Sequence, residues 1–218
     1  RVSVIRLDGS EFHDVFRDTH WLSHFQFSPD NPDIAMFCHE GPWNYVQQRI
    51  WMINMNTGDI WPCFRQTEDD CVGHEFWAQN GDVIFDNRRG GHDGTISNSK
   101  SQVYASEHVS AEIPYFGFAH KDGKVYRKIN MPFYCNHYFA NGDLSMFAGD
   151  AVDDILLIQP AEDGTAKMKI LAHHNTTWHY QRSHCHPTFS WDGKKLLYAA
   201  DTDEWHDNLF LVDVPESI

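Results

Sequence analysis

The sequence lacks any apolar run near the eighteen or so residues that a membrane-spanning helix requires. It shows no signal-peptide pattern at its start, and it opens on Arg1 rather than on methionine, so we expect an N-terminal part to be missing. Basic residues are few, because 17 Lys and Arg stand against 31 Asp and Glu, which gives a formal net charge of −14. These features argue against a membrane partner and against nonspecific binding to nucleic acid.

Cysteine is also scarce. The five cysteines are odd in number, and no two of them have the spacing of a CxxC motif. A framework of disulfides is therefore not expected. Reduced thiols in a cytoplasmic protein are the simpler interpretation.

Helical periodicity is nearly absent, which argues against a helical fold. Short alternating apolar runs take its place, and turns rich in Gly, Asp and Asn separate them. At 218 residues with 41% hydrophobic content, the chain can bury a sizeable core. The runs that we expect to form strands are "RVSVIRLDG", "QRIWMINMNTGD", "GDVIFD", "DILLIQP", "KKLLYAAD" and "NLFLVDV".

Four segments of the chain share one pattern: each begins with His, continues through an apolar or aromatic pair, turns at Asp, Asn or Gly, and enters a second strand. Their starts are spaced by 50, 63 and 49 residues. The longest interval contains a predicted insertion loop at 96–116. The segments are "HFQFSPDNPDIAMFCHEG" from 24, "HEFWAQNGDVIFDNRRG" from 74, "HYFANGDLSMFAGDA" from 137 and "HPTFSWDGKKLLYAADTD" from 186.

A repeat of about 40–50 residues built from strands alone is typical of a β-propeller with one four-stranded blade per repeat. We therefore predict an all-β fold in which residues 1–218 form a single propeller domain. Residues 1–23 are expected to be the outer strands of an earlier blade, so the ring is predicted to be partial. The first strand of each blade lines the central channel, and the histidines that lead the repeats, His24, His74, His137 and His186, are expected to converge there.

The segment "QRSHCHP" places His184 and His186 one residue apart, with Gln181 three positions before the first. In an extended chain both rings point to one face and Cys185 points to the other. With His137 from the adjacent blade, they offer three imidazoles and one amide oxygen. This set suits zinc or a first-row transition metal and tolerates Mn²⁺. The alternative is a hydrogen-bonded polar lining of a watery channel.

Arg49 and His74 supply a fixed positive charge and a base with an ordinary pKa near 6.5. The alternative for Arg49 is a salt bridge between blades, and for His74 a hydrogen bond within the blade packing.

Four further residues are predicted to contact substrate. They are His24, His39, Trp43 and Arg88. The only argument for His24 is its place in the repeat. For His39 and Trp43 the alternative is a packed loop, and for Arg88 it is an exposed turn.

From about residue 20 to the end, these motifs resemble the oligogalacturonate lyases of polysaccharide lyase family 22. The resemblance lies in "SHFQFSPDNPDIAMFCHEGPW", "QRIWMIN", "GHEFW", "NHYFANGDLSMFAGD" and "QRSHCHPTFSWDGKKLLYAADTD". It implies a seven-bladed propeller, of which this chain covers roughly the C-terminal four blades, with the other blades in a missing N-terminal part. It also implies Mn²⁺-dependent β-elimination on short oligogalacturonides in pectin degradation.

The resemblance implies roles for particular residues as well. The metal ligands of the family fall on His137, Gln181, His184 and His186, and its catalytic arginine and histidine fall on Arg49 and His74. The stretch between His74 and His137 is longer than the family pattern. An insertion there is expected to alter the mouth of the cleft, so the resemblance does not fix the length of the substrate. The competing hypothesis is a non-enzymatic propeller similar to TolB that serves as a platform for binding proteins or sugars.

Overall fold

Antiparallel sheets follow one another along the chain in the computed structural model, which describes residues 1–42, 45–88, 114–131, 135–178, 183–203 and 206–218. A two-stranded sheet comes first, formed by β1 (Val2–Ile5) and β2 (Phe12–Phe16). The first complete blade contains β3 (Trp21–Phe27), β4 (Ile34–Glu40), β5 (Ile50–Asn54) and β6 (Ile60–Pro62).

The second blade contains β7 (Val72–Trp77), β8 (Val83–Asn87), β9 (Tyr115–Ala119) and β10 (Val125–Asn130). The third blade contains β11 (Tyr138–Ala140), β12 (Phe147–Asp150), β13 (Asp154–Pro160) and β14 (Ala166–His173). The last sheet has three strands, β15 (Thr188–Phe189), β16 (Lys195–Asp201) and β17 (Asp207–Asp213).

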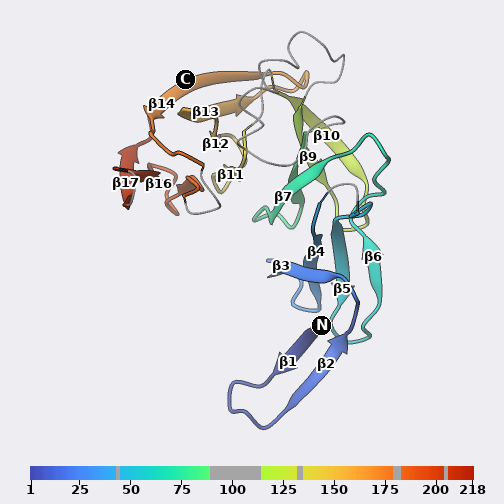
Figure 1. The fold of residues 1–218 in the computed structure, drawn as a ribbon. Helices are drawn as coiled ribbons and strands as arrows, with labels where there is room; N and C mark the ends of the chain where they lie inside the picture. Colours follow the sequence, from blue (N-terminus) through green and yellow to red (C-terminus); the bar gives the residue numbers. More distant parts are fainter. Residues whose placement is uncertain (43–44, 89–113, 132–134, 179–182, 204–205) are drawn as a thin grey trace.

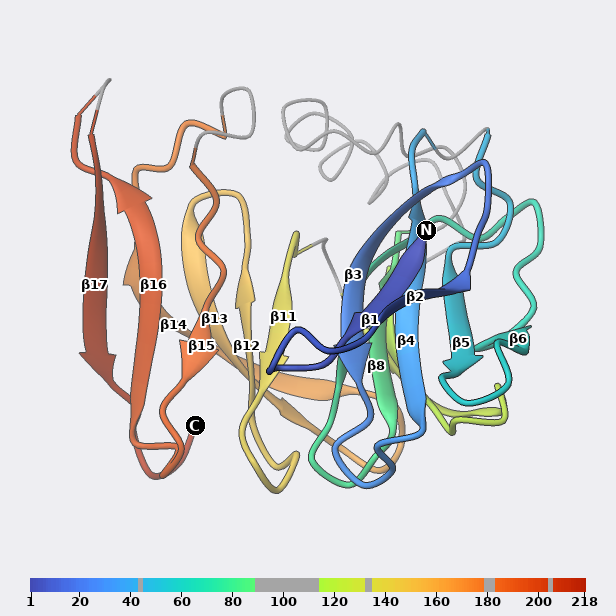
Figure 2. The same ribbon diagram turned by 90° about the horizontal axis from the view of Figure 1, so that it is seen from below.

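The sheets are arranged as an open arc, with β1 and β2 at one end and β16 and β17 at the other (Figure 1). The first strands β3 and β11 face the concave side of the arc, and the last strands β6 and β14 lie outside (Figure 1). Figure 2 shows the same sheets side by side from below. The predicted all-β propeller class is confirmed, since every element of the described residues is a strand. That 1–218 is one domain with its other blades in a missing N-terminal part stays a prediction.

The middle strands of each blade are buried on both faces. Every residue of β8, β9 and β12 is buried, whereas β14 and β17 at the edges are largely exposed. This explains why the middle strands β4 and β13 carry continuous apolar runs. No helix long and apolar enough to cross a membrane occurs in the part of the chain that the structure describes.

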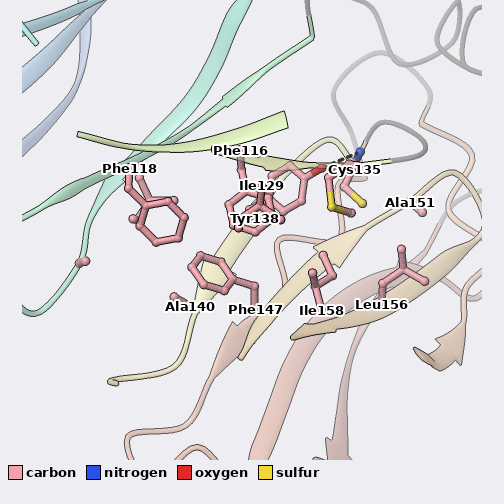
Figure 3. Packing of buried hydrophobic residues seen from close by; sticks show 13 residues of the cluster. Phe116, Phe118, Ile129, Cys135, Tyr138, Ala140, Phe147, Ala151, Leu156 and Ile158 are labelled. Carbon is pink, nitrogen blue, oxygen red and sulfur yellow. Dashed lines mark hydrogen bonds between the residues drawn. The ribbon is translucent and has the colours of Figure 1, made fainter. Parts of the chain in front are cut away.

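Apolar side chains between neighbouring blades form the cores of the molecule. Between the second and third blades, Phe116 of β9 lies against Phe147 of β12 with ring centroids 4.7 Å apart (Figure 3). Similar clusters join the first blade to the second and the third blade to the last sheet. Because each core is shared between two sheets, the packing of one blade sets the position of the next.

One turn brings two blades into close contact. Gly123, between β9 and β10, has a φ of 88°, and a Cβ atom there would collide with the carbonyl group of Cys63. Glycine adopts this left-handed conformation without steric cost. The predicted insertion loop at 96–116 lies mostly outside the described residues, although its last two residues, Tyr115 and Phe116, begin β9.

Candidate metal centre

The histidines that lead the four repeats form a continuous series of ring contacts across the sheets. The ring of His24 lies 6.3 Å from that of His74, His74 lies 4.2 Å from His137, and His137 lies 3.7 Å from His186, measured between centroids. Residues about 50 positions apart are thus neighbours in the order of the repeats. The convergence expected from the repeats is therefore present.

Three of the predicted metal ligands meet at one point. His137, His184 and His186 each offer a ring nitrogen, and these atoms all lie within 4.8 Å of one another. The separations suit three ligands of one ion, since metal–nitrogen bonds are about 2.0–2.1 Å long for zinc and similar for its neighbours. The residues present therefore fit a transition-metal ion. The fourth predicted ligand, Gln181, lies outside the described residues.

The backbone around these ligands differs from the extended strand expected from the sequence. Strand β15 begins only at Thr188, and His186 has a φ of 44°, in the left-handed region. The rings of His184 and His186 nevertheless lie 5.7 Å apart with an interplanar angle of 30°. Cys185 points away from them into the core of the last sheet, where it is 1% exposed, as predicted.

Asp150, the last residue of β12, holds the centre together. Its carboxylate accepts hydrogen bonds from the ring Nδ1 of His137 at 2.7 Å and from the backbone N–H of His137 at 2.5 Å. It also accepts one from the backbone N–H of His186 at 3.3 Å. Asp150 is fully buried, so this one carboxylate fixes ligands from two sheets.

Two of the ligand imidazoles are held in the neutral form. Burial, followed by the electrostatic effect of nearby His137, lowers the pKa of His186 to about 4. The same two causes lower the pKa of His184. Neutral imidazole is the form that coordinates a metal.

His74 lies beside this centre and faces a second buried carboxylate. Its Nδ1 atom lies 3.7 Å from Oδ1 of Asp86, and neither atom has a hydrogen-bond partner among the described residues. Burial lowers the pKa of His74 well below its ordinary value, and His137 and Arg88 act in the same direction. Burial raises the pKa of Asp86 to about 6 against the effect of Arg88. His74 is therefore a neutral base with 30% of its side chain exposed.

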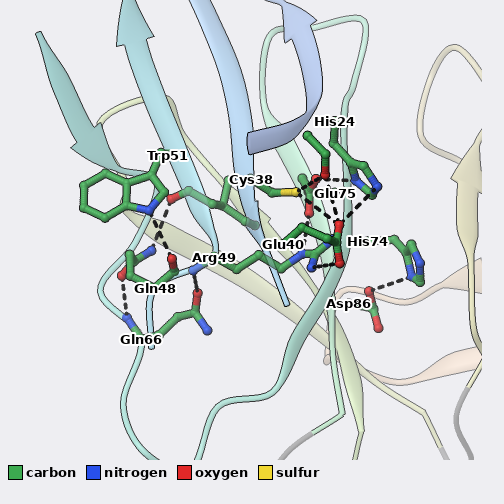
Figure 4. Close-up of polar contacts among 12 residues, drawn as sticks. His24, Cys38, Glu40, Gln48, Arg49, Trp51, Gln66, His74, Glu75 and Asp86 are labelled. Atoms are coloured by element: carbon green, nitrogen blue, oxygen red, sulfur yellow. Dashed lines mark hydrogen bonds and ion pairs between the residues drawn. The ribbon is translucent and has the colours of Figure 1, made fainter. Parts of the chain in front are cut away.

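Arg49 lies in an ionic network that joins the first and second blades (Figure 4). Its Nε donates to Glu75 at 3.1 Å, and its two terminal nitrogens donate to the carboxylate of Glu40 at 3.2 and 3.4 Å. Glu75 also binds the Nδ1 of His24 at 2.7 Å. Burial opposes the charge of Arg49, but Glu75 and Glu40 offset it and raise the pKa. Arg49 therefore forms the salt bridge between blades that was the alternative for this residue. Its remaining N–H groups are still able to bind a ligand.

The other predicted substrate contacts fall in different places. His39 is buried against Trp51 and Phe37, away from the series of leading histidines. Arg88 is only 7% exposed and donates to Asp86 and Asn136, so the alternative of an exposed turn is wrong for this residue. Trp43 lies outside the described residues.

Sequence reasoning did not pair the leading histidines with the carboxylates that face them. Glu40 lies 3.8 Å from His24, Asp86 lies 3.7 Å from His74 and Asp150 lies 2.7 Å from His137. The sequence does contain a pattern that indicates these carboxylates. The first three repeats each have an acidic residue near the end of the second strand, in "FCHE", "IFDN" and "FAGD". Antiparallel pairing places that end opposite the start of the first strand.

Comparison with solved structures identifies the fold. An oligogalacturonate lyase in complex with manganese matches with a TM-score of 0.75 at 22% identity, over 97% of this chain and 53% of that chain. An oligogalacturonate lyase from Vibrio parahaemolyticus matches with a TM-score of 0.77, also at 22% identity, over 97% of this chain and 54% of that chain. A putative TolB from Agrobacterium tumefaciens matches with a TM-score of 0.56 at 10% identity, over 99% and 69%. These likenesses show the propeller fold.

Sequence comparison identifies the family. The oligogalacturonide lyase of Pectobacterium atrosepticum is 26% identical over 238 residues, and the oligogalacturonate lyase of Dickeya dadantii is 25% identical over 240 residues. The matches cover 99% and 100% of this chain and 56% of each relative, so the chain spans about half the length of these proteins. The family model described as oligogalacturonate lyase matches residues 1–218. The resemblance expected from the sequence is confirmed, and this chain belongs to the oligogalacturonate lyase family.

Proposed function

We propose that the protein cleaves short oligogalacturonides, such as digalacturonate, by metal-assisted β-elimination and releases 4,5-unsaturated uronates during pectin degradation. The observation that carries this proposal is the cluster of His137, His184 and His186 with the neutral imidazole of His74 beside it. Three ligands and an adjacent base are what the removal of a proton next to a carboxylate requires.

The proton to be removed is on C5 of the uronate, next to the carboxylate group. It is weakly acidic, because its loss places a second negative charge on that carboxylate. His137, His184 and His186, together with Gln181, would hold the ion, and Mn²⁺ is favoured by the family resemblance and by the manganese complex of the similar structure. When bound, the ion supplies electrostatic stabilisation of the developing negative charge, an effect of several kcal/mol.

His74 is the proposed base. Its ring is neutral and partly exposed, and it lies against the ligand His137. Asp86 faces its Nδ1 atom at 3.7 Å. Once His74 has taken the C5 proton, the imidazolium is stabilised by this buried carboxylate, and a shorter contact can form between the two groups. The electron pair of the C5–H bond then forms the C4–C5 double bond, while the C4–O bond breaks and its own electron pair leaves with the oxygen of the departing sugar, which takes up a proton from water.

Arg49 is the proposed electrophilic residue that binds the substrate carboxylate. Arginine carries five N–H donors in a planar fork, and three hydrogen bonds join Arg49 to Glu75 and Glu40. The two carboxylates fix the plane of the guanidinium, and the remaining donors can pair with a uronate. Losing one such oxyanion donor typically costs about 3 kcal/mol of transition-state stabilisation.

The charge of the chain bears on the size of the substrate. A net charge of −14 repels a long polyanion, whereas the ion and the buried arginines attract one or two uronate units locally. We therefore propose that short oligomers are cleaved faster than polymeric pectin.

All five cysteines are free and buried, which supports a reducing compartment such as the cytoplasm.

The competing function is a binding platform of the TolB type. It requires neither a base nor converging ligands, and substitution of His184 or His186 would leave binding unchanged. The histidine cluster favours the lyase.

The test is the absorbance of unsaturated uronate after digalacturonate and Mn²⁺ are added to the purified protein. We expect a steady rise that a chelator abolishes and that fresh Mn²⁺ restores. His184→Ala should remove the rise, and His120→Ala, a change at an exposed histidine in the turn between β9 and β10 that pairs with Asp82, should retain it. No rise with any divalent metal from a folded protein would refute the lyase.

A further inference from the structure

A second group of possible metal ligands lies outside the site described above. It contains Asp18 and His20, in the connection between β2 and β3, and His39 of β4. Each offers one ligand atom, and the three atoms lie within 4.8 Å of one another. The group shares no residue with the cluster around His137.

The two oxygens of Asp18 have different surroundings. Oδ1 accepts hydrogen bonds from the backbone N–H groups of Thr19 and His20 at 2.6 and 3.2 Å, and it lies 2.9 Å from Nδ1 of His20. Oδ2 faces Nε2 of His39 at 3.3 Å. The first oxygen fixes the carboxylate, and the second is directed at the imidazole of His39.

His39 has an unsatisfied nitrogen at this point. The residue is 5% exposed, and its Nε2 atom is buried without a hydrogen-bond partner among the described residues, although Oδ2 of Asp18 lies 3.3 Å away. A buried ring nitrogen without a partner is uncommon in folded proteins and calls for an explanation such as a bound ion. Trp51 and Phe37 pack around this ring, which keeps other polar groups away.

The separation of Oδ2 and Nε2 fits a shared ion. Two ligands at about 2.0–2.2 Å from a tetrahedral zinc ion lie roughly 3.4 Å apart. The observed distance is 3.3 Å. The ring of His20 lies parallel to that of His39 with centroids 4.1 Å apart, and 48% of its side chain is exposed, so a turn of this ring toward the ion breaks little buried contact.

The charges of the group also suit a dication. Hydrogen bonds from His20 and Thr19 outweigh burial and lower the pKa of Asp18 to about 2. Burial and the nearby His20 lower the pKa of His39. An ionised carboxylate and a neutral imidazole are the forms that bind a metal ion.

We propose that Asp18, His20 and His39 form a second divalent-metal site, which takes Zn²⁺ or another first-row dication and ties the two-stranded sheet to the first complete blade. Two imidazoles and one carboxylate favour such ions over Ca²⁺ or Mg²⁺. Because β2 leads directly into Asp18 and His39 lies within β4, an ion here joins segments that no disulfide connects. A metal that binds only the folded protein raises its thermal stability.

The test is the Zn²⁺ content of the purified protein after dialysis against a slight excess of Zn²⁺, measured for single variants. We expect two equivalents in the unchanged protein, of which one is lost in His20→Ala and in Asp18→Asn and the other in His184→Ala. His120→Ala is the matched control, since His120 pairs with Asp82 in an exposed His–Asp contact of 2.8 Å, with no third ligand among the described residues. This control should bind as much Zn²⁺ as the unchanged protein.

The thermal midpoint gives a second readout. It should rise with Zn²⁺ in His184→Ala, and this rise should be absent when His20→Ala is added to that variant. His20 is half exposed, so its variant is expected to fold, and its midpoint without metal checks this. Retention of all bound Zn²⁺ by both His20→Ala and Asp18→Asn, or loss of all of it in His184→Ala alone, would overturn the proposal.

Discussion

The Nδ1 atom of His137 lies 2.7 Å from Oδ2 of the buried Asp150, and the same carboxylate receives the backbone N–H of His186. The hydrogen bond at Nδ1 makes Nε2 of His137 the nitrogen with a lone pair to offer a metal, and Nδ2 of Asn136 lies 3.2 Å from it. It also makes the imidazole a stronger donor to a metal. One residue of β12 therefore sets the orientation of ligands from the third blade and the last sheet.

Asp150→Asn is expected to lower the affinity for Mn²⁺ by about 10–100-fold, as loss of a carboxylate behind a histidine ligand usually does. Titration of the metal-free protein with Mn²⁺ measures the change. The matched control is Asp86→Asn, a buried carboxylate beside His74 rather than beside a ligand. An Asp150→Asn protein that binds Mn²⁺ as tightly as the unchanged protein would show that this contact does not support the metal centre.

His74→Ala is expected to lower kcat by about 10²–10⁴-fold, the usual contribution of a general base. Its Mn²⁺ content should stay the same, because His74 is not among the three clustered ligands. Steady-state kinetics on digalacturonate and elemental analysis of the same sample separate the two effects. Activity within a few-fold of the unchanged protein would assign proton removal to another group.

The pair His24–Glu75 is expected to make stability depend on pH. The hydrogen bond to Glu75 outweighs burial and raises the pKa of His24 in the folded protein above the value of about 6.5 in the unfolded chain. The stabilisation is therefore complete below about pH 6.5 and is lost as the pH rises through the folded-state pKa.

His24→Asn tests this dependence and suits the left-handed φ of 52° at this position, which asparagine tolerates. The loss in free energy of unfolding, measured by urea denaturation against the unchanged protein, should be larger at about pH 5.5 than at about pH 9. An equal loss at both pH values would mean that His24 is not charged in its contact with Glu75.

Phe147→Ala is expected to lower the free energy of unfolding by about 3–5 kcal/mol. The ring of Phe147 is fully buried between the second and third blades, where it contacts Phe116 and Phe118. Leu211→Ala removes an exposed side chain of β17 and should change stability by less than about 0.5 kcal/mol. Urea denaturation of both variants makes the comparison, and equal losses would place the main stabilising contacts elsewhere.

Much of the fold could be predicted because the repeat is local. Each segment carries its own alternation and turn residues, so the strands at 50–54, 83–87 and 154–160 are visible in the sequence. The convergence of the leading histidines follows from the phase of the repeat alone. The left-handed backbone at His186 could not be predicted, because an irregular residue before a strand has no periodic signal.

The partners of the site residues could be predicted only in part. Strand alternation does turn Cys185 away from the ligands, yet nothing local indicates that Asp150 receives His137 or that Glu75 and Glu40 hold Arg49. These contacts join residues 9–26 positions apart along the chain, at different strands or in different sheets. A shift of one residue exchanges the two faces of a strand, so such pairs need coordinates.

The sequence by itself determined the strand content, the repeat and the line of histidines, because these depend on the order of residue types within one segment. Only the tertiary structure decided which carboxylate faces which imidazole, and that Asp18, His20 and His39 come together. Contacts between segments depend on how shared apolar cores set the spacing of neighbouring sheets, and that spacing is a property of the packed chain rather than of any one segment.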